Sequence, residues 1–368
     1  MRIPTLHDVA RAAGVSYSTA DRVLNDRGKV AEKSAQRVRD AMESLGYRRD
    51  IRAANLARQR AYRFRFYLPQ GDHGFYTVLR EALEAQVVPR RSDRILIERH
   101  DVPALDDEAL AARLEATAPG DCDCIALVGI QSPRLEAAIA RLVAAGIPVL
   151  TLVSDAAESA RALYVGIDNV AAGRTAGRLI RLAHRGAQGV VLPILGRRDL
   201  RDHGDRLAGV TGVLAEPGAA CTVLPPIEVL DQPERMSESL ARALREAPAI
   251  TAIYSIGAGN RALIGLLRGL PAPRPVVVLH ELTAHSRAAL EQGLVDAVID
   301  QKPAEEIARA LDAMTAIADG MAPQPARVVP MIYLHDNLPA LTEADAAAGG
   351  PDLATGSGGR VPSEERIA

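Results

Sequence analysis

The stretch Gly14–Asn25, GVSYSTADRVLN, decides how the first part of this chain is interpreted. A glycine opens it, small hydroxylated and aromatic residues follow, and an arginine stands inside an apolar pattern. A helix–turn–helix needs a first helix, a tight turn with a small residue, and a second helix whose early residues reach base edges. Gly14 supplies the turn, and Arg22 can form two hydrogen bonds to the O6 and N7 atoms of a guanine. We therefore expect the helix after Gly14 to lie in a DNA groove.

The flanking segments complete an all-α head of three helices. Thr5 followed by Asp8 is typical of a capping-box start. A second helix begins near Ser16, and a third over 32–45 places apolar residues on one face. Residues 48–60 carry little apolar surface, and a short helix of that kind is marginal in water. We expect this piece to become ordered only against a partner.

The charge is unevenly distributed along the chain. Residues 1–60 hold 13 Lys and Arg against 7 Asp and Glu, a net charge of +6, whereas the whole chain carries −2 and the remainder therefore −8. A basic head on a larger acidic body fits a module that binds a polyanion, joined to a second module of another kind.

The body alternates strands and helices from residue 62 to residue 338. This alternation predicts doubly wound parallel α/β sheets with right-handed crossovers. About ten strands are more than one sheet comfortably holds, so we expect two lobes. Residues 339–368 lack periodicity and are predicted to be disordered. No apolar run is long enough to span a bilayer and the first residues lack a secretory signal, so the sequence predicts a cytoplasmic protein without membrane contact.

Polar side chains follow successive strands of the body. Ligands bind at the carboxyl ends of parallel strands, and carboxylates, guanidinium groups and amides each offer the paired hydrogen bonds that neighbouring hydroxyls require. An aromatic ring in QGDHGFY can stack on the C–H side of a sugar ring. The candidate ligand-binding residues are Phe75 or Tyr76 for stacking, and Asp168, Arg206, Asn260, Glu281 and Gln301 for polar contacts.

Residues 5–57 closely resemble the DNA-binding head of the LacI/GalR family of bacterial transcriptional regulators. The resemblance is carried by TLHDVARAAGVSYSTADRVLN, by the third helix, by LGY, and by the segment that follows. It implies a helix–turn–helix domain over 1–48 and a hinge over 49–61 that folds on DNA. The DNA-contacting residues it implies are Thr5, Ser16, Tyr17, Ser18, Thr19, Arg22, Asn25, Ala53, Asn55, Leu56 and Ala57, with Leu56 as a wedge in the central minor groove. Asp21, Ala31 and Arg49-Asp50 depart from the family pattern.

Residues 62–335 resemble the periplasmic sugar-binding-protein fold that this family uses as its sensor, on GIDNVAAGRTAG, GDRLAGV, GAGNRALIG and VIDQKPAEEIARA. Carried over by those segments, Asp168, Arg206, Asn260 and Gln301 would hold the ligand, and Glu281 stands where Asp is more usual. The implied sensor spans 62–338, with chain crossings near 162, 301 and 324. Its lobes are 62–162 with 302–323, and 163–301 with 324–338.

Two other classes of protein, a dinucleotide-binding enzyme and a transporter's solute-binding protein, share some of these sequence features. Gly257-x-Gly259-x-x-Ala262 with Glu281 about 20 residues on fits a dinucleotide fingerprint, but it lies deep in the second lobe. A transporter's solute-binding protein would not carry the head. The three cysteines at 122, 124 and 221 are too sparse for a metal site and are expected as reduced thiols. No catalytic set, metal or cofactor is predicted.

The sequence thus predicts a homodimeric transcriptional regulator that binds double-stranded DNA. We expect a repressor that a sugar or polyol releases from a palindromic operator, with the helix over 75–88 in the dimer face. A corepressor-dependent regulator or an activator with the same architecture is the alternative, and the sign of the ligand's effect on operator affinity distinguishes them.

Overall fold

The computed structural model describes residues 4–24, 30–45, 60–71, 74–198, 200–230, 232–246 and 250–340. The chain divides into a head that ends at Ala61 and a body that begins at Tyr62, where the sequence places the start of the sensor. Within the described ranges, no helix is both long and apolar enough to cross a membrane.

The head is a small bundle of α1 (Leu6–Ala12), α2 (Tyr17–Leu24) and α3 (Glu32–Ser44). Its core consists of small and β-branched side chains, chiefly Val9, Ala20 and Val38, each with no exposed surface. The capping box is present: the Thr5 hydroxyl accepts from the Asp8 backbone, and the Asp8 carboxylate accepts from the Thr5 backbone. The helix–turn–helix predicted from the sequence therefore forms.

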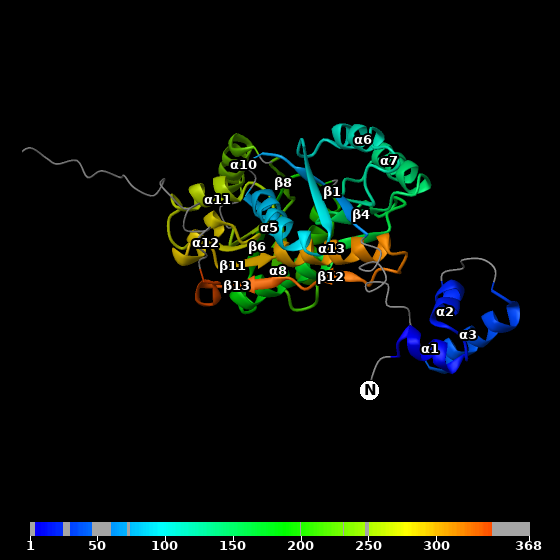
Figure 1. The fold of residues 1–368 in the computed structure, drawn as a ribbon. Helices are drawn as coiled ribbons and strands as arrows, with labels where there is room; N and C mark the ends of the chain where they lie inside the picture. Colours follow the sequence, from blue (N-terminus) through cyan, green and yellow to red (C-terminus); the bar gives the residue numbers. More distant parts are fainter. Residues whose placement is uncertain are drawn as a thin grey trace, which may run out of the picture. The chain divides into compact units, whose positions relative to one another are not determined.

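The first lobe of the body is a parallel sheet in the order β12-β5-β4-β3-β1-β2 (Figure 1). Its strands are β1 (Tyr62–Pro69), β2 (Ile95–Val102), β3 (Cys124–Val128), β4 (Val149–Leu152), β5 (Leu163–Ile167) and β12 (Ala326–Val328). Helices α5 (Gly74–Arg91) and α13 (Pro303–Ala318) pack on one face, and α6 (Asp107–Glu115) and α7 (Pro133–Ala144) on the other. Strands β3 and β4 are buried throughout because helices cover both faces, whereas the edge strand β2 carries charged residues and exposes part of its length.

The second lobe is built on a sheet in the order β13-β11-β10-β9-β6-β7, with β8 also paired to β6. Its strands are β6 (Gly189–Leu195), β7 (Cys221–Val223), β8 (Ile227–Glu228), β9 (Ala252–Ser255), β10 (Val276–His280), β11 (Ala297–Asp300) and β13 (Met331–Tyr333). Helices α8 (Asn169–His184) and α9 (Arg201–Leu214) cover one face. The other face packs against α10 (Pro233–Glu246), α11 (Asn260–Leu267) and α12 (Ala284–Glu291), and a short 3-10 turn, η1 (His335–Asn337), follows β13.

Two details of the second sheet differ from the expectation. The single strand expected over 222–230 is two short strands, β7 and β8, because prolines at 225 and 226 cannot donate to a ladder. The last strand, β13, pairs antiparallel with β11, whereas the alternation predicted parallel strands only.

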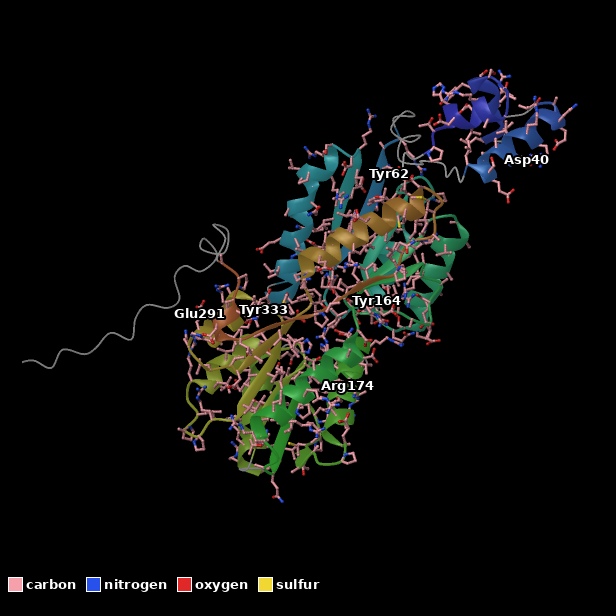
Figure 2. All side chains as sticks on the ribbon, turned by 90° about the horizontal axis from the view of Figure 1, so that it is seen from below. Asp40, Tyr62, Tyr164, Arg174, Glu291 and Tyr333 are labelled. Atoms are coloured by element: carbon pink, nitrogen blue, oxygen red, sulfur yellow. The ribbon has the colours of Figure 1, made fainter. Side chains whose placement is uncertain are left out.

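The chain crosses between the lobes a few residues later than the sequence suggested. Both β5 and β12 pair within the first sheet, so the first and third crossings follow Ile167 and Val328, while the second falls at Gln301. An apolar run such as LYVGI predicts a buried strand but carries no information about which sheet it joins. Figure 2 shows Tyr62 and Glu291 in opposite lobes, with Tyr164 of β5 near the junction.

The cysteines are free in this structure, as the sequence predicted. Cys122 and Cys124 are buried beside or within β3, and Cys221 is half-buried. Burial raises the pKa of the Cys122 thiol to about 11, so this thiol remains protonated at neutral pH.

Helices α8 and α9 approach each other more closely than ordinary side chains permit. A Cβ atom added at Gly173 would lie 2.0 Å from the carbonyl oxygen of Arg206, and one added at Gly209 would lie 2.2 Å from that of Val170. This close contact places the Arg206 side chain beneath the edge of the sheet, where the candidate site lies.

We expect Gly173→Ala to force α8 and α9 apart and to lower the free energy of unfolding by about 1–3 kcal/mol, the usual cost of overpacking. Gly212→Ala is the matched control, because a Cβ at Gly212 of α9 meets nothing within 4 Å. That substitution should be neutral or stabilise by up to about 1 kcal/mol. Urea denaturation of both variants measures this, and equal effects would refute the close-packing explanation.

Candidate ligand-binding cleft and DNA-binding face

A buried arginine organises the carboxyl edge of the second sheet. Arg206 of α9 has 1% of its side chain exposed. Its Nε donates to Asn169 Oδ1 at 2.8 Å, and its Nη1 donates to the carbonyl of Ile256 at 2.8 Å. Nη1 also lies 3.4 Å from Glu281 Oε1, which accepts from Gln301 Nε2 at 2.8 Å. Groups from α8 and from the ends of two strands thus meet at one guanidinium, and Gln301 after a third strand joins them through Glu281.

The backbone around the cleft is strained where the strands end. Val153, Glu281 and Lys302 adopt φ angles of 63°, 74° and 62°, a region that non-glycine residues rarely occupy. The Asp300 carboxylate accepts hydrogen bonds from the backbone N–H groups of Leu282 and Lys302, at 3.0 Å and 2.9 Å, and holds two of these turns. Strain that the surrounding structure maintains in this way is characteristic of functional sites.

Several buried polar atoms in the same region lack partners. Among the described residues, these include Arg206 Nη2, Gln301 Oε1, Asp202 Oδ1, Ser154 Oγ and both carboxyl oxygens of Glu306. Leaving a buried polar atom unsatisfied costs about 1–3 kcal/mol, so folded proteins rarely retain such atoms without a reason. A polar ligand would satisfy them.

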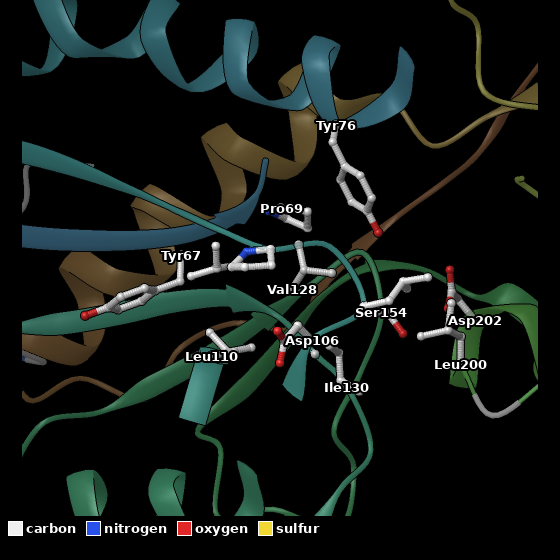
Figure 3. Close-up of a pocket in the computed structure, with 14 residues that line it drawn as sticks. Tyr67, Pro69, Tyr76, Asp106, Leu110, Val128, Ile130, Ser154, Leu200 and Asp202 are labelled. Carbon is white, nitrogen blue, oxygen red and sulfur yellow. The ribbon is translucent and has the colours of Figure 1, made fainter. Parts of the chain in front are cut away.

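A pocket opens between the lobes beside this cluster (Figure 3). It is lined by Tyr76 of α5, Ser154 after β4, and Asp202 of α9, and its enclosed volume is about 20 Å³. In Figure 3 the hydroxyl end of Tyr76 points towards Ser154 and Asp202. Each lobe therefore contributes polar groups to one small space, which in this arrangement has room for about one water molecule.

The lobes touch at the edge of the cleft. Arg197 Nη1 of the second lobe donates to the carbonyl of Leu105 in the first at 3.1 Å. A Cβ at Gly74 of α5 would lie 3.1 Å from the Thr283 side chain. These contacts define a closed arrangement of the lobes.

Burial dominates the electrostatics of the cluster. Glu306, at the start of α13, is fully buried; desolvation first and the nearby Glu281 second raise the pKa of its carboxyl well above the ordinary value. Burial likewise lowers the pKa of His280 well below its usual range, and Tyr254 Oη lies 2.7 Å from His280 Nε2. Glu306 and His280 are therefore held in their uncharged forms.

Three of the predicted ligand-binding residues, Arg206, Glu281 and Gln301, lie together as described. Asn260 lies at the start of α11, where its Nδ2 donates to the His280 carbonyl at 2.9 Å and its Oδ1 accepts from Ser255 at 2.5 Å. Its amide therefore supports the β10 turn that carries Glu281.

The remaining predicted ligand-binding residues lie apart from the Arg206 cluster. Asp168 caps α8 by accepting from the backbone of Ala171 at 3.0 Å, pairs with Arg327 at 3.2 Å, and lines a neighbouring pocket. Phe75 is 4% exposed and packs in the core of the first lobe, whereas Tyr76 lines the cleft. Of the two aromatic residues, Tyr76 is therefore the one that reaches the pocket.

Four residues of this region were not predicted from the sequence: Asn169, Ser154, Asp202 and Glu306. Two of them carried a usable signal, because residues four apart share a helix face. Asp202 lies one turn before Arg206 in α9, and Glu306 lies three residues after the buried Pro303 in α13. Asn169 and Ser154 each lie near the end of a strand, but no sequence pattern distinguishes them from other residues at strand ends.

The exposed face of α2 carries the residues expected to read bases. Tyr17, Ser18 and Arg22 are exposed, and the Tyr17 ring stacks on His7 with centroids 4.4 Å apart. The Ser16 hydroxyl lies 2.9 Å from those of both Ser18 and Thr19, which orders the start of the helix. The predicted contacts Asn25, Ala53, Asn55, Leu56 and Ala57 lie outside the described residues.

A helix–turn–helix head joined to a two-lobed body with a polar cleft defines a DNA-binding protein controlled by a ligand. Residues 5–50 match the bacterial regulatory proteins of the lacI family, and residues 64–322 match the periplasmic binding protein domain. The chain thus carries a DNA-binding head of the lacI family and belongs, over most of its length, to the periplasmic binding protein domain family, which confirms the resemblance seen in its sequence.

Two relatives align with most of the chain. It is 24% identical to the HTH-type transcriptional regulator DegA of Bacillus subtilis over 278 residues, which are 75% of this chain and 80% of DegA. It is 29% identical to the regulator GntR of Pseudomonas aeruginosa over 285 residues, 75% of this chain and 78% of GntR. The chain is accordingly a transcriptional regulator and not an enzyme, which excludes the dinucleotide alternative.

Solved structures support the fold of the body. A solute-binding protein of Burkholderia graminis in complex with D-arabinose superposes with a TM-score of 0.69 at 21% identity, covering 76% of this chain and 98% of that protein. GanP, a glucose-galactose binding protein of Geobacillus stearothermophilus, gives a TM-score of 0.67 at 20% identity, covering 76% of this chain and 100% of GanP. Both confirm the predicted periplasmic-binding-protein architecture.

We expect stability to depend on pH through Glu306. A carboxyl whose pKa is raised by folding binds its proton more tightly in the native state, so stability falls as pH rises above the unfolded-state pKa. Between about pH 5 and pH 8, Glu306→Gln should gain stability relative to the wild type by on the order of 1 kcal/mol or more.

The matched control is Glu305→Gln. Lys302 and Arg309 bind the Glu305 side chain and lower the pKa of its carboxyl, so it is ionised throughout that interval and its replacement should not change the pH slope. Urea denaturation at several pH values compares the three proteins. Parallel pH profiles for the wild type and Glu306→Gln would contradict the assignment.

Proposed function

We propose that this regulator is a homodimeric repressor that binds a palindromic operator and is released from it by a sugar or polyol. The observation that carries the proposal is the buried polar cluster around Arg206, together with the pocket between the lobes that Ser154 and Asp202 line. Because the protein acts on DNA, we propose that it is located in the cytoplasm.

The chemistry of the cleft supports a polyhydroxyl ligand. Arg206 donates, Glu281 accepts, and the Gln301 amide can do both, so neighbouring hydroxyls of one ring would find complementary partners. Tyr76, on the opposite lobe, offers an aromatic face to the apolar side of such a ring. The D-arabinose and glucose-galactose binding proteins with this fold support the same ligand class.

The head supports operator binding through α2. In the proposed complex Tyr17, Ser18 and Arg22 meet base edges in the major groove, with Arg22 bidentate to a guanine. Thr5, Ser16 and Thr19 would contact phosphates while keeping their helix-capping roles. The hinge, with Leu56 as a minor-groove wedge, would fold between two half-sites.

Dimerisation would join two first lobes. Helix α5 buries Phe75, Leu79 and Leu83 against its own sheet, so these side chains are committed to the core. Val88 on α5 and Leu96 on β2 remain 73% and 48% exposed, and a second copy would cover them. Closure on a ligand would then change the spacing of the two hinges, which couples the sites reciprocally, typically by about 1–3 kcal/mol.

The first experiment is a thermal-shift screen of the full-length protein with sugars, polyols and nucleobases, followed by operator binding with and without each hit. A ligand that binds the folded state raises the melting temperature by mass action. A sugar or polyol that also lowers operator affinity supports the proposal. A response only to nucleobases, or a ligand that raises operator affinity, contradicts it.

Gln301→Ala should weaken binding of the ligand found in that screen by roughly 5- to 100-fold, as expected for loss of a buried hydrogen-bonding group worth about 1–3 kcal/mol. Operator affinity without ligand should stay unchanged. Gln292→Ala, an exposed glutamine at the end of α12, is the control. Isothermal titration calorimetry measures the ligand affinities, and an undiminished affinity in Gln301→Ala would remove that residue from the site.

Arg22→Ala should cost about 1–3 kcal/mol of operator binding and relax the preference at one base pair. Arg39→Ala, on the exposed side of α3 and paired with Glu32, should affect binding little. Fluorescence anisotropy on a set of operators with single base changes tests both. If Arg22→Ala loses the same affinity on every sequence, Arg22 contacts the backbone and not a base.

A further inference from the structure

The atoms that the cleft leaves without protein partners include several hydrogen-bond acceptors. Within the described part of the chain, Asp202 Oδ1 and Gln301 Oε1 have no hydrogen-bond partner, and neither do the carboxyl oxygens of Glu306, one of which donates when the group is protonated; Arg206 Nη2 is an unused donor among them. Carboxylates and phosphates only accept, whereas hydroxyl groups also donate. A ligand that satisfies these atoms must therefore bring donors.

The cluster also holds an excess of acidic groups. Asp202, Glu281 and Glu306 act electrostatically on a single guanidinium, that of Arg206. Burial first and the neighbouring Glu281 second raise the pKa of the Glu306 carboxyl, so a further negative charge beside it is disfavoured. An anionic ligand would add one.

Two exposed arginines close to Asp202 in sequence already form ion pairs. Arg198 pairs with Glu228 at 3.5 Å, and Arg201 pairs with Asp205 at 3.7 Å. The positive end of the α9 dipole, which would otherwise attract an anion, has Asp202 in its first turn. Recruiting these groups for an anionic ligand would mean breaking pairs that already exist.

We propose that Asp202 restricts the cleft to uncharged polyhydroxyl ligands, from which it accepts a hydroxyl hydrogen bond, and excludes sugar acids and sugar phosphates. Asp202 faces Tyr76 and Ser154 across the pocket (Figure 3), so a ligand hydroxyl can reach it there. This inference rests on the proposed sugar or polyol function and adds to it the charge of the ligand and the residue that selects it.

The test uses full-length protein and isothermal titration calorimetry on matched compounds: glucose, glucuronate, glucose 6-phosphate and glucosamine; galactose and galacturonate; sorbitol and gluconate. An anion within hydrogen-bond reach of a carboxylate should bind about 100-fold more weakly than its uncharged counterpart. We expect the tightest ligand to be uncharged and its acid or phosphate to show that deficit.

Two variants on α9 assign the effect to one residue. Asp202→Asn keeps the shape of the side chain and removes its charge, and should reduce the discrimination to about 10-fold or less. Asp205→Asn removes a carboxylate that lines the neighbouring pocket and not the one between the lobes. This variant should preserve the discrimination between uncharged and anionic ligands. Near-ultraviolet circular dichroism of each variant checks that the body is folded.

The outcomes separate this inference from the function on which it rests. If an anionic compound or glucosamine binds most tightly, or if Asp202→Asn discriminates as strongly as the wild type, the inference is overturned while a sugar-responsive regulator stands. If no member of the panel binds the folded protein, the proposed ligand class is wrong and the inference fails with it.

Discussion

Burying a guanidinium is costly unless acceptors replace the lost water, and Arg206 imposes this requirement on the second lobe. The Asn169 side chain, the Ile256 carbonyl and the Glu281 carboxylate come from three different elements and are all fixed by this one side chain. The position of Arg206 depends in turn on Gly173, where any side chain would collide with its backbone. The glycine contact between α8 and α9 and the polar edge of the sheet are therefore parts of one constraint.

The same edge shows a compromise between stability and binding. Unpartnered buried atoms and positive φ angles at Glu281 and Lys302 both destabilise the free protein. The apolar cores on both faces of each sheet supply stability elsewhere. A site that is poorly satisfied when empty gains more when it is filled, and this difference is the free energy that a ligand can use to hold the lobes together.

Local chemistry made much of this molecule predictable. The head follows from a cap, a glycine turn and helical periodicity, and the alternation of the body predicts its layers. It was harder to predict which of two neighbouring residues at the end of an element faces the site, because one step along a helix turns a side chain by about 100°. Asp168 therefore caps a helix while Asn169 joins the cluster, and Phe75 enters the core while Tyr76 faces the cleft. Glu306 was missed because a glutamate is normally assigned to the surface.

The second crossing gives the cleft a direct covalent route to the first lobe. Gln301 ends the last parallel strand of one sheet, and two residues later Pro303 begins α13, which packs in the core beneath the other sheet. A hydrogen-bonded helix is stiff, so a shift at its first turn is conveyed along its length instead of being absorbed. In the proposed function, a ligand that displaces Gln301 would therefore also displace α13, whose packing lies in the neighbouring lobe.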